Sequence, residues 1–350
     1  MTSEASSLPT RRLGKAGLAV TIIGFGGIPI QVVSESIALA TVRRAADLGV
    51  NFFDTARGYT NSEERIGKAL EGRDYFVATK SGRRDAEGIY TDVERSLVNL
   101  RRRQIDLYQL HGVNNDDELE AVLANGGALE GLRRARDEGK IGHIGITGHR
   151  RETLVRAVEE CEHFASVQVP FNLVEDEILS HLIPLCQTKD VGVIAMKPVG
   201  GGNFTNPALA VKWCLSQPIT TAIPGMATPE EVEENLSVAE HPELTEEDVV
   251  AISRMKSELD QRTCRRCRYC EPCPQEVQIS SLLHGRSIVR RMGAPRWKEW
   301  GALDIIASAE KCIECGVCVE KCPYDLPIPE LIREAVEFYR GIPELSGQES

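Results

Sequence analysis

Short β-rich runs alternate with helical stretches between residues 20 and 239 of this chain of 350 residues. Eight strands alternating with eight helices are the pattern of a (β/α)8 TIM barrel, and continuous apolar runs are typical of buried parallel strands. A doubly wound open sheet would carry a Gly-x-Gly-x-x-Gly motif after its first strand, and none follows here. The expected strands are VTIIGFG, VNFFDT, DYFVATK, IDLYQLH, IGHIGIT, SVQVPFN, VGVIAMK and TTAIPG, and the expected helices span residues 36–48, 63–70, 92–100, 129–138, 152–160, 177–189, 207–216 and 230–239.

The rest of the chain suggests one smaller domain after this α/β barrel. The segment TRRLGKAGL, which starts at Thr10, can form a hairpin that plugs the N-terminal end of the barrel. Helical patterns continue at residues 246–259, 279–292 and 328–339. We therefore expect a flexible N-terminus over 1–10, a barrel over 11–260, a small α-rich domain over 261–340 and a flexible C-terminus over 341–350.

Composition and charge limit the possible partners. The net charge of -11 argues against nucleic-acid binding, and the sequence shows no signal peptide and no apolar run of membrane-spanning length, so we expect a cytoplasmic protein. Residues 261–300 hold nine Lys and Arg against three Glu, which gives +6 and leaves -17 on the remainder. This basic segment either packs on the acidic remainder or docks an acidic redox partner of the ferredoxin or flavodoxin type.

Polar residues follow three successive expected strands. Asp54, Lys80 and His111 stand at the ends of the second, third and fourth strands, and Tyr59 lies on the loop after Asp54. The C-terminal strand ends form the active-site face of such a barrel, so these side chains should converge. Each alone could be a helix cap, a surface lysine or a core histidine. Together they can reduce a carbonyl, because a lysine cation lowers the pKa of a tyrosine that must supply a proton.

The segments FFDTARGYTNSEERIG, VATKSG and DLYQLH resemble the aldo-keto reductase superfamily. The resemblance runs from Arg11 to about Ala239 and implies an oxidoreductase that interconverts a small-molecule carbonyl and an alcohol. It also implies a nicotinamide cofactor, NADH or NADPH, across the barrel mouth. The resemblance assigns the catalytic tetrad to Asp54, Tyr59, Lys80 and His111, and cofactor contacts to Thr147, Gln168, Met196, Lys197, Gly200, Gly201, Gly202, Gly225, Glu234 and Asn235.

Several positions depart from the superfamily pattern at the expected cofactor site. Many relatives carry a basic residue near IPGMATPEE that holds the 2′-phosphate of NADPH, whereas this segment has two acids, Glu230 and Glu231, and no base. Gly148 replaces a common asparagine, and Met196 replaces an aromatic side chain that stacks on the nicotinamide in many members. Use of NADH, weak binding of NADPH and the absence of nicotinamide chemistry all stay open.

Eight of the 11 cysteines lie in two short runs. The second run has the spacing C-x2-C-x2-C-x3-C-P, which resembles the bacterial ferredoxin motif for [4Fe-4S] clusters, and the first is one residue shorter. In that motif the fourth cysteine serves the other cluster. Structural zinc sites are the alternative, although zinc usually takes separated cysteine pairs. The resemblance predicts one cluster held by Cys264, Cys267, Cys270 and Cys322, and a second held by Cys312, Cys315, Cys318 and Cys273.

The whole chain resembles the aldo-keto reductases that carry a C-terminal ferredoxin-like domain, and this leaves three hypotheses. The barrel interconverts a carbonyl and an alcohol with nicotinamide while the clusters exchange electrons with a partner. Alternatively, the clusters supply the electrons without nicotinamide, and the tetrad works only as acid and base. The third hypothesis makes the cluster domain a structural or docking module. The loops over residues 112–125 and 200–206, which would form walls of the pocket, contain no sequence motif that identifies the substrate.

Overall fold

The computed structural model describes residues 8–202 and 204–346. Contacts divide the chain into two compact units. The first unit comprises residues 1–200 and 205–245, and the second comprises 201–204 and 246–350. The helix at 246–260 therefore belongs by its contacts to the second unit, whereas the sequence analysis groups it with the barrel.

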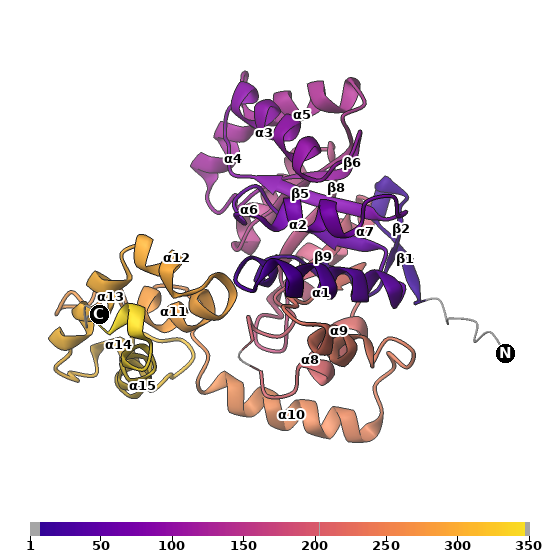
Figure 1. The fold of residues 1–350 in the computed structure, drawn as a ribbon. Coiled ribbons are helices and arrows are strands. Elements are labelled where there is room, and N and C mark those ends of the chain that lie inside the picture. The colour runs from indigo at the N-terminus through magenta and orange to yellow at the C-terminus, as the bar shows by residue number, and fades with distance from the viewer. Residues whose placement is uncertain (1–7, 203, 347–350) are drawn as a thin grey trace. The chain divides into compact units, whose positions relative to one another are not determined.

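Eight parallel strands form the first unit, and they are hydrogen-bonded in the order β10-β9-β8-β7-β6-β5-β4-β3 (Figure 1). Parallel bridges join Ile23 to Ala222 and Gly26 to Gly225, so the two outer strands nearly close the barrel. This confirms the expected fold. The strands are β3 (Phe25–Gly26), β4 (Phe52–Asp54), β5 (Phe76–Ser81), β6 (Ile105–Leu110), β7 (Ile141–Thr147), β8 (Phe164–Pro170), β9 (Gly192–Met196) and β10 (Thr221–Ile223).

Helices alternate with these strands and bury their apolar faces, as amphipathic helices around a barrel should. One helix, α4, lies in the segment 112–125 that the sequence analysis treats as a loop. It forms because Asn115 caps it by accepting a hydrogen bond from Glu118 N at 2.8 Å, while Leu119 and Val122 are buried. The helices are α1 (Glu35–Asp47), α2 (Ser62–Ala69), α3 (Ala86–Asn99), α4 (Asp116–Leu123), α5 (Ala128–Asp137), α6 (Arg151–Glu160), α7 (Leu182–Thr188), α8 (Pro207–Leu215) and α9 (Pro229–Leu236).

A hairpin fills the N-terminal end of the barrel, as the sequence predicts. Strands β1 (Thr10–Arg12) and β2 (Ala19–Thr21) pair antiparallel, and Leu13 and Val20 join an apolar cluster with residues from the strands. The expected strand Val20–Gly26 is therefore too long, because its first residues belong to the hairpin and only Phe25–Gly26 forms the barrel strand. The plug leaves the opposite end, where the strands terminate, as the face for a site.

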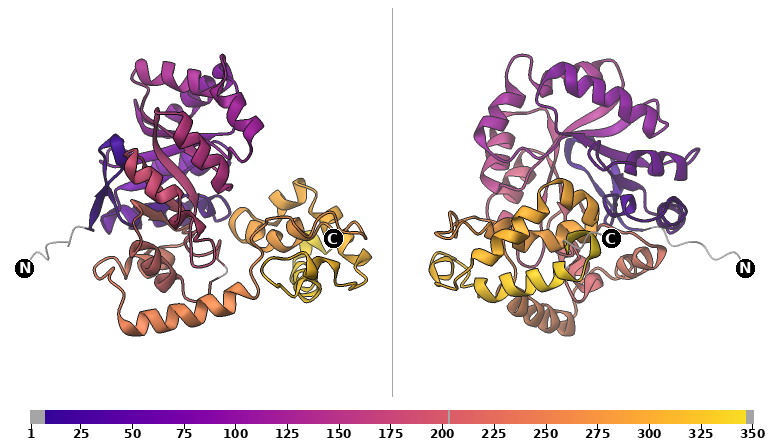
Figure 2. Two further views of the ribbon diagram at one scale, coloured as in Figure 1. Left: turned by 180° about the vertical axis from the view of Figure 1, so that it is seen from behind. Right: turned by 60° about the vertical axis from the view of Figure 1, so that its left-hand side comes forward.

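The second unit consists of helices, and no strand lies within residues 246–346 (Figure 2). It has its own apolar core, in which Trp297, Tyr339 and Leu282 are buried. Leu345 also joins this core, within the segment from residue 341 that the sequence predicts to be a flexible terminus; residues 347–350 lie outside the described part. The helices are α10 (Glu246–Asp260), α11 (Ile279–Met292), α12 (Ala294–Glu299), α13 (Ala302–Ser308), α14 (Val317–Glu320) and α15 (Ile328–Arg340).

Among the described helices of both units, none combines the length and the apolar character that a membrane crossing requires.

Candidate active site

Three of the residues predicted at strand ends lie together at the C-terminal face of the barrel. Asp54 is the last residue of β4, Lys80 is the penultimate residue of β5, and His111 directly follows β6. These strands are neighbours in the sheet, with Asp54 in register with Ala78 and Lys80 with Gln109. Adjacent parallel strands end at one edge, so the side chains converge as their positions in the sequence suggest.

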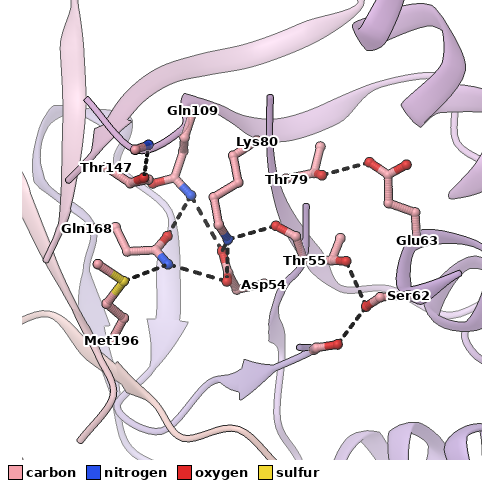
Figure 3. Close-up of polar contacts among 12 residues, drawn as sticks. Asp54, Thr55, Ser62, Glu63, Thr79, Lys80, Gln109, Thr147, Gln168 and Met196 are labelled. Carbon is pink, nitrogen blue, oxygen red and sulfur yellow. Dashed lines mark hydrogen bonds and ion pairs between the residues drawn. The ribbon is translucent and has the colours of Figure 1, made fainter. Parts of the chain in front are cut away.

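Lys80 and Asp54 form a buried ion pair at the centre of the site (Figure 3). The ammonium Nζ donates to both carboxylate oxygens, at 2.6 and 2.8 Å, and to the backbone oxygen of Thr55 at 2.8 Å. Lys80 is fully buried and Asp54 is 3% exposed. Burial alone would lower the pKa of Lys80, but the attraction of Asp54 and its hydrogen bonds outweigh burial and raise that pKa. The site therefore holds a fixed cation at neutral pH.

Tyr59 lies next to this cation on the loop between β4 and α2. The Lys80 Nζ atom is 5.1 Å from the centre of the tyrosine ring, and a hydrogen bond with Tyr59 is one of the interactions that raise the pKa of Lys80. The ring centres of Tyr59 and His111 are 5.9 Å apart, with the rings nearly perpendicular. The structure thus brings the four residues of the expected tetrad together.

His111 stays neutral in this environment. Burial, together with the positive charges of Lys80 and Arg84, lowers the pKa of its imidazole to about 3. Arg84 is held beside it by donating hydrogen bonds to the backbone oxygens of His111 and Gly112, each at 3.0 Å. A neutral imidazole can both donate and accept a hydrogen bond, whereas an imidazolium only donates.

Two buried glutamines support the carboxylate from the other side. Gln109 donates to Gln168 Oε1 at 2.7 Å, and longer contacts of 3.5 and 3.4 Å join the two amide nitrogens to Asp54 (Figure 3). The sequence analysis assigns Gln168 to the cofactor and overlooks Gln109. The signal was available, because Gln109 precedes His111 by two residues and two-residue spacing places side chains on one face of a strand.

Other residues expected at the cofactor surround this group. Thr147 is in register with Gln168, and its hydroxyl accepts a hydrogen bond from Gly112 N at 3.0 Å. Met196, at the end of β9, lies with its sulfur 3.9 Å from the Gln168 amide nitrogen and is partly exposed. These two side chains therefore lie beside Gln168, which in turn contacts Asp54.

The expected pyrophosphate segment has an unusual backbone. Lys197 has φ of +57°, and Gly200, Gly201 and Gly202 follow with φ of +58°, +70° and +86°. Three successive residues in this region require glycine, because a Cβ atom would strain each one. By its contacts the second unit includes residues 201–204, and there Arg290 of α11 donates to Gly202 O at 2.6 Å.

The two residues expected near the adenine, Glu234 and Asn235, differ in their exposure to solvent. Glu234 is exposed, whereas Asn235 is 4% exposed and donates to the backbone oxygen of Glu231 in its own helix. Gly225 pairs with Gly26 at the closure of the barrel, and a Cβ there would lie 2.8 Å from Pro29. Glu231 caps α9 by accepting from Ala227 N at 2.6 Å. A carboxylate thus occupies the segment where many relatives place a base.

Electrostatic interactions link cysteines of the two runs, as the predicted exchange of ligands would require. Burial, and then the neighbouring charges of Cys267 and Cys322, raise the pKa of Cys264. Burial raises the pKa of Cys270 to about 12, followed by the effects of Cys264, Glu271 and Cys267.

The other set gathers around a separate cavity. Cys273 lines it together with the first three cysteines of the second run, Cys312, Cys315 and Cys318. Each set draws three thiols from one run and a fourth from the other. Two groups of four thiols fit the donor requirement of two [4Fe-4S] clusters.

Comparison with known proteins agrees with this geometry. The profile of the aldo/keto reductase family matches residues 22–208, and a profile described as a 4Fe-4S dicluster domain matches residues 263–327. The second match favours iron–sulfur clusters over the zinc alternative.

Individual relatives cover most of the first unit. L-galactose dehydrogenase from Arabidopsis thaliana is 29% identical over 308 residues, which cover 73% of this chain and 95% of that protein. The apo form of an aldo-keto reductase from Bacillus halodurans is 26% identical with a TM-score of 0.59, covering 71% of this chain and 96% of that one. An aldo-keto reductase from Klebsiella pneumoniae in complex with NADPH is 24% identical with a TM-score of 0.61, covering 71% and 95%, and supports the fold alone.

More than half of the sequence matches one family profile, and the fold agrees with that match. The chain therefore belongs to the aldo/keto reductase family of oxidoreductases and carries a C-terminal 4Fe-4S dicluster domain.

Proposed function

We propose that the barrel interconverts a small-molecule carbonyl and the corresponding alcohol, with Tyr59 as the acid that protonates the oxygen. The observation that carries this proposal is the buried cation of Lys80, held by Asp54 and adjacent to the Tyr59 ring. A cation that burial and an ion pair hold beside a phenol favours the phenolate, and thereby lowers the pKa of the acid toward neutral pH.

The proposed reduction balances in one step. A bound dihydronicotinamide would supply the hydride, which carries two electrons, for the carbonyl carbon and would itself be oxidised. The Tyr59 hydroxyl gives its proton to the oxygen, and Lys80 stabilises the phenolate that remains. The neutral imidazole of His111 donates a hydrogen bond to the carbonyl oxygen and orients it.

The nicotinamide would lie against Thr147, Gln168 and Met196. Gln168 contacts Asp54, and the other two residues lie beside Gln168. The left-handed glycine segment at 200–202 has no side chains of its own, which would suit the close approach of a pyrophosphate, although Arg290 already donates to Gly202 O there. We propose NADH as the cofactor, because the carboxylates of Glu230 and Glu231 would repel the 2′-phosphate of NADPH. The Klebsiella relative was solved with NADPH. The proposed preference for NADH rests on the acidic segment of this chain alone.

The two [4Fe-4S] clusters would exchange single electrons with an acidic carrier protein at the first cysteine run. Arg268 and Tyr269 lie between Cys267 and Cys270 in the sequence; the Arg268 side chain is 69% exposed and Tyr269 is 65% exposed. Each encounter would reduce or oxidise one cluster by one electron while the carrier changes by one in the opposite sense. A basic surface favours such an acidic partner and makes association depend on salt.

A second candidate function follows from the acidic segment and from Met196. Both weaken the cofactor site relative to the family pattern, so the clusters could supply electrons to the substrate while the tetrad provides only protons. The third possibility is a structural or docking role for the clusters. The docking role is favoured by the apolar core of the second unit, which gives that unit a source of stability besides the metal.

Anaerobically purified, cluster-loaded protein distinguishes these functions. We expect oxidation of NADH by carbonyl compounds, a loss of about 10²- to 10⁴-fold in Tyr59→Phe, and unchanged NADH binding in that variant. Turnover with reduced ferredoxin but never with NADH would overturn the nicotinamide proposal in favour of the second function. Full turnover and unchanged electron uptake in folded Cys315→Ser protein would support the third.

A further inference from the structure

An ion pair spans the loop that carries Tyr59. Arg57 lies two residues before the tyrosine and Glu63 lies four residues after it, and Arg57 Nη1 meets Glu63 Oε2 at 2.5 Å. A second hydrogen bond, from the Thr55 hydroxyl to the Ser62 hydroxyl at 2.8 Å, also joins the residues before the loop to those after it (Figure 3). The segment bearing the tyrosine is therefore tied at both ends.

Glu63 is an unusual residue for the first turn of a helix, because it is only 2% exposed. Its carboxylate accepts four hydrogen bonds. One comes from Arg57, and the other three come from Thr79 Oγ1 at 2.8 Å, Ser96 Oγ at 2.7 Å and Asn99 Nδ2 at 3.0 Å. A buried carboxylate needs such partners to offset its lost hydration, so its position is fixed by several elements at once.

The same network forms hydrogen bonds with three consecutive residues of β5, the strand that carries Lys80. Thr79 bonds to Glu63 on the outer face of β5, and Arg57 N donates to Lys80 O at 2.9 Å. Ser81 donates to Asp92 at 2.6 Å, and the Arg57 Nε atom lies 3.9 Å from that same carboxyl group. Lys80 therefore faces the site from a strand whose outer side is held by the partners of the tyrosine loop.

We infer that Arg57 and Glu63 are positioning residues, and that their ion pair sets the distance between the Tyr59 hydroxyl and the Lys80 ammonium. The inference rests on the proposed function for its catalytic consequence. The distance between the Tyr59 hydroxyl and the Lys80 ammonium can be tested whatever the substrate is. A displacement of about 1 Å in a reacting group can cost about 10²-fold in rate, so a loop anchor of this kind has a measurable effect.

The charged and titratable groups around Tyr59 are Lys80 from β5, Asp54 from β4 and His111 after β6. Lys80 is the nearby cation, and His111 remains neutral through the accessible pH range. If the loop moves away from Lys80, the phenol loses the interaction that favours its ionised form. Its titration midpoint should then move upward.

The test compares Arg57→Met and Glu63→Gln with Arg83→Met in cluster-loaded protein. Arg83 also approaches Asp92, at 3.7 Å, but it does not flank the tyrosine loop, so it controls for a lost charge near that carboxyl. We expect kcat to fall about 10- to 100-fold in Arg57→Met with KM nearly unchanged, partial recovery in Arg57→Lys, and little change in Arg83→Met.

A second measurement separates this inference from the proposed function. The ultraviolet titration of tyrosinate in each protein, minus that of the same protein with Tyr59→Phe, gives the midpoint of Tyr59 alone. We expect an upward move of about one pH unit in Arg57→Met, even if no carbonyl substrate is turned over. An unchanged midpoint, or an equal change in Arg83→Met, would overturn the positioning role. If Glu63→Gln does not fold, the variants of Arg57, whose side chain is 22% exposed against 2% for Glu63, decide the question.

Discussion

Replacing Lys80 by methionine tests the central ion pair most severely. The substitution keeps much of the side-chain volume but leaves the Asp54 carboxylate buried without its cation. At 2.6 Å and an effective dielectric constant of about 20, the direct attraction is about 6 kcal/mol, part of which only offsets the cost of burying both charges. Removal of one partner from a buried pair typically costs about 3–5 kcal/mol of folding stability.

Amide hydrogen exchange in β5 reports this loss without interference from the clusters. If β5 exchanges through opening of the barrel, a loss of about 3–5 kcal/mol should speed its exchange by roughly 10²- to 10³-fold or more at neutral pH. Lys68→Met is the matched control, because Lys68 meets Glu35 at the same kind of distance, 2.5 Å, with both side chains about half exposed. Its effect should be much smaller.

The pH dependence provides a second check. Without Lys80, burial raises the pKa of Asp54 in the folded state and is opposed only by the hydrogen bonds from Gln168 and Gln109. The folded variant then holds its proton more tightly than the unfolded chain, so its stability rises as the pH falls and is lost as the pH rises. The amide exchange rate of β5 in the variant, divided by that in the wild type, should therefore decrease as the pH is lowered from about 8 to 5.5. A ratio near one, or a large ratio that does not change with pH, would refute the buried-pair account.

Three further predictions address other parts of the molecule. Because the folded pKa of His111 is about 3, its contribution to stability is present above about pH 6.5 and is lost as the pH falls toward 3, so acid unfolding of His111→Gln should lack that dependence. Cys322→Ser should alter the electron paramagnetic resonance signal of the cluster of the first run, whereas Cys273→Ser should alter that of the second; the reverse assignment would contradict the exchange of ligands. Arg268→Glu should slow electron uptake from reduced ferredoxin and weaken its salt dependence, whereas Lys311→Glu, the same charge change beside the other run, should not; equal effects in stopped-flow traces would exclude docking at the first run.

Much of the fold could be predicted because barrel strands leave a strong signal. Continuous apolar runs bounded by polar residues locate the strands, and the rule that active sites lie at their C-terminal ends singles out Asp54, Lys80 and His111. The length of the first strand could not be predicted in the same way. The run from Val20 to Gly26 is uniformly apolar, because the plug and the barrel interior both require buried side chains.

The rest of the site depends on contacts between distant segments. Gln109 and Gln168 are 59 positions apart, and nothing in either strand alone indicates that the two amides pair. Glu63 looks like an ordinary acid in the first turn of a helix, where a negative charge is favourable, and only the packing of α2 and α3 on β5 shows that it is buried. Pairing and burial of this kind follow from the tertiary structure and carry no local pattern.

The claim that the barrel works with nicotinamide is tested most directly by calorimetric titration of the anaerobic, cluster-loaded protein with NADH and with NADPH. The account predicts saturable binding of NADH, at least about tenfold weaker binding of NADPH, and a narrowing of that difference when Glu230 is replaced by arginine. Failure of both nucleotides to bind a protein whose clusters are intact would contradict the account and leave the clusters as the source of electrons.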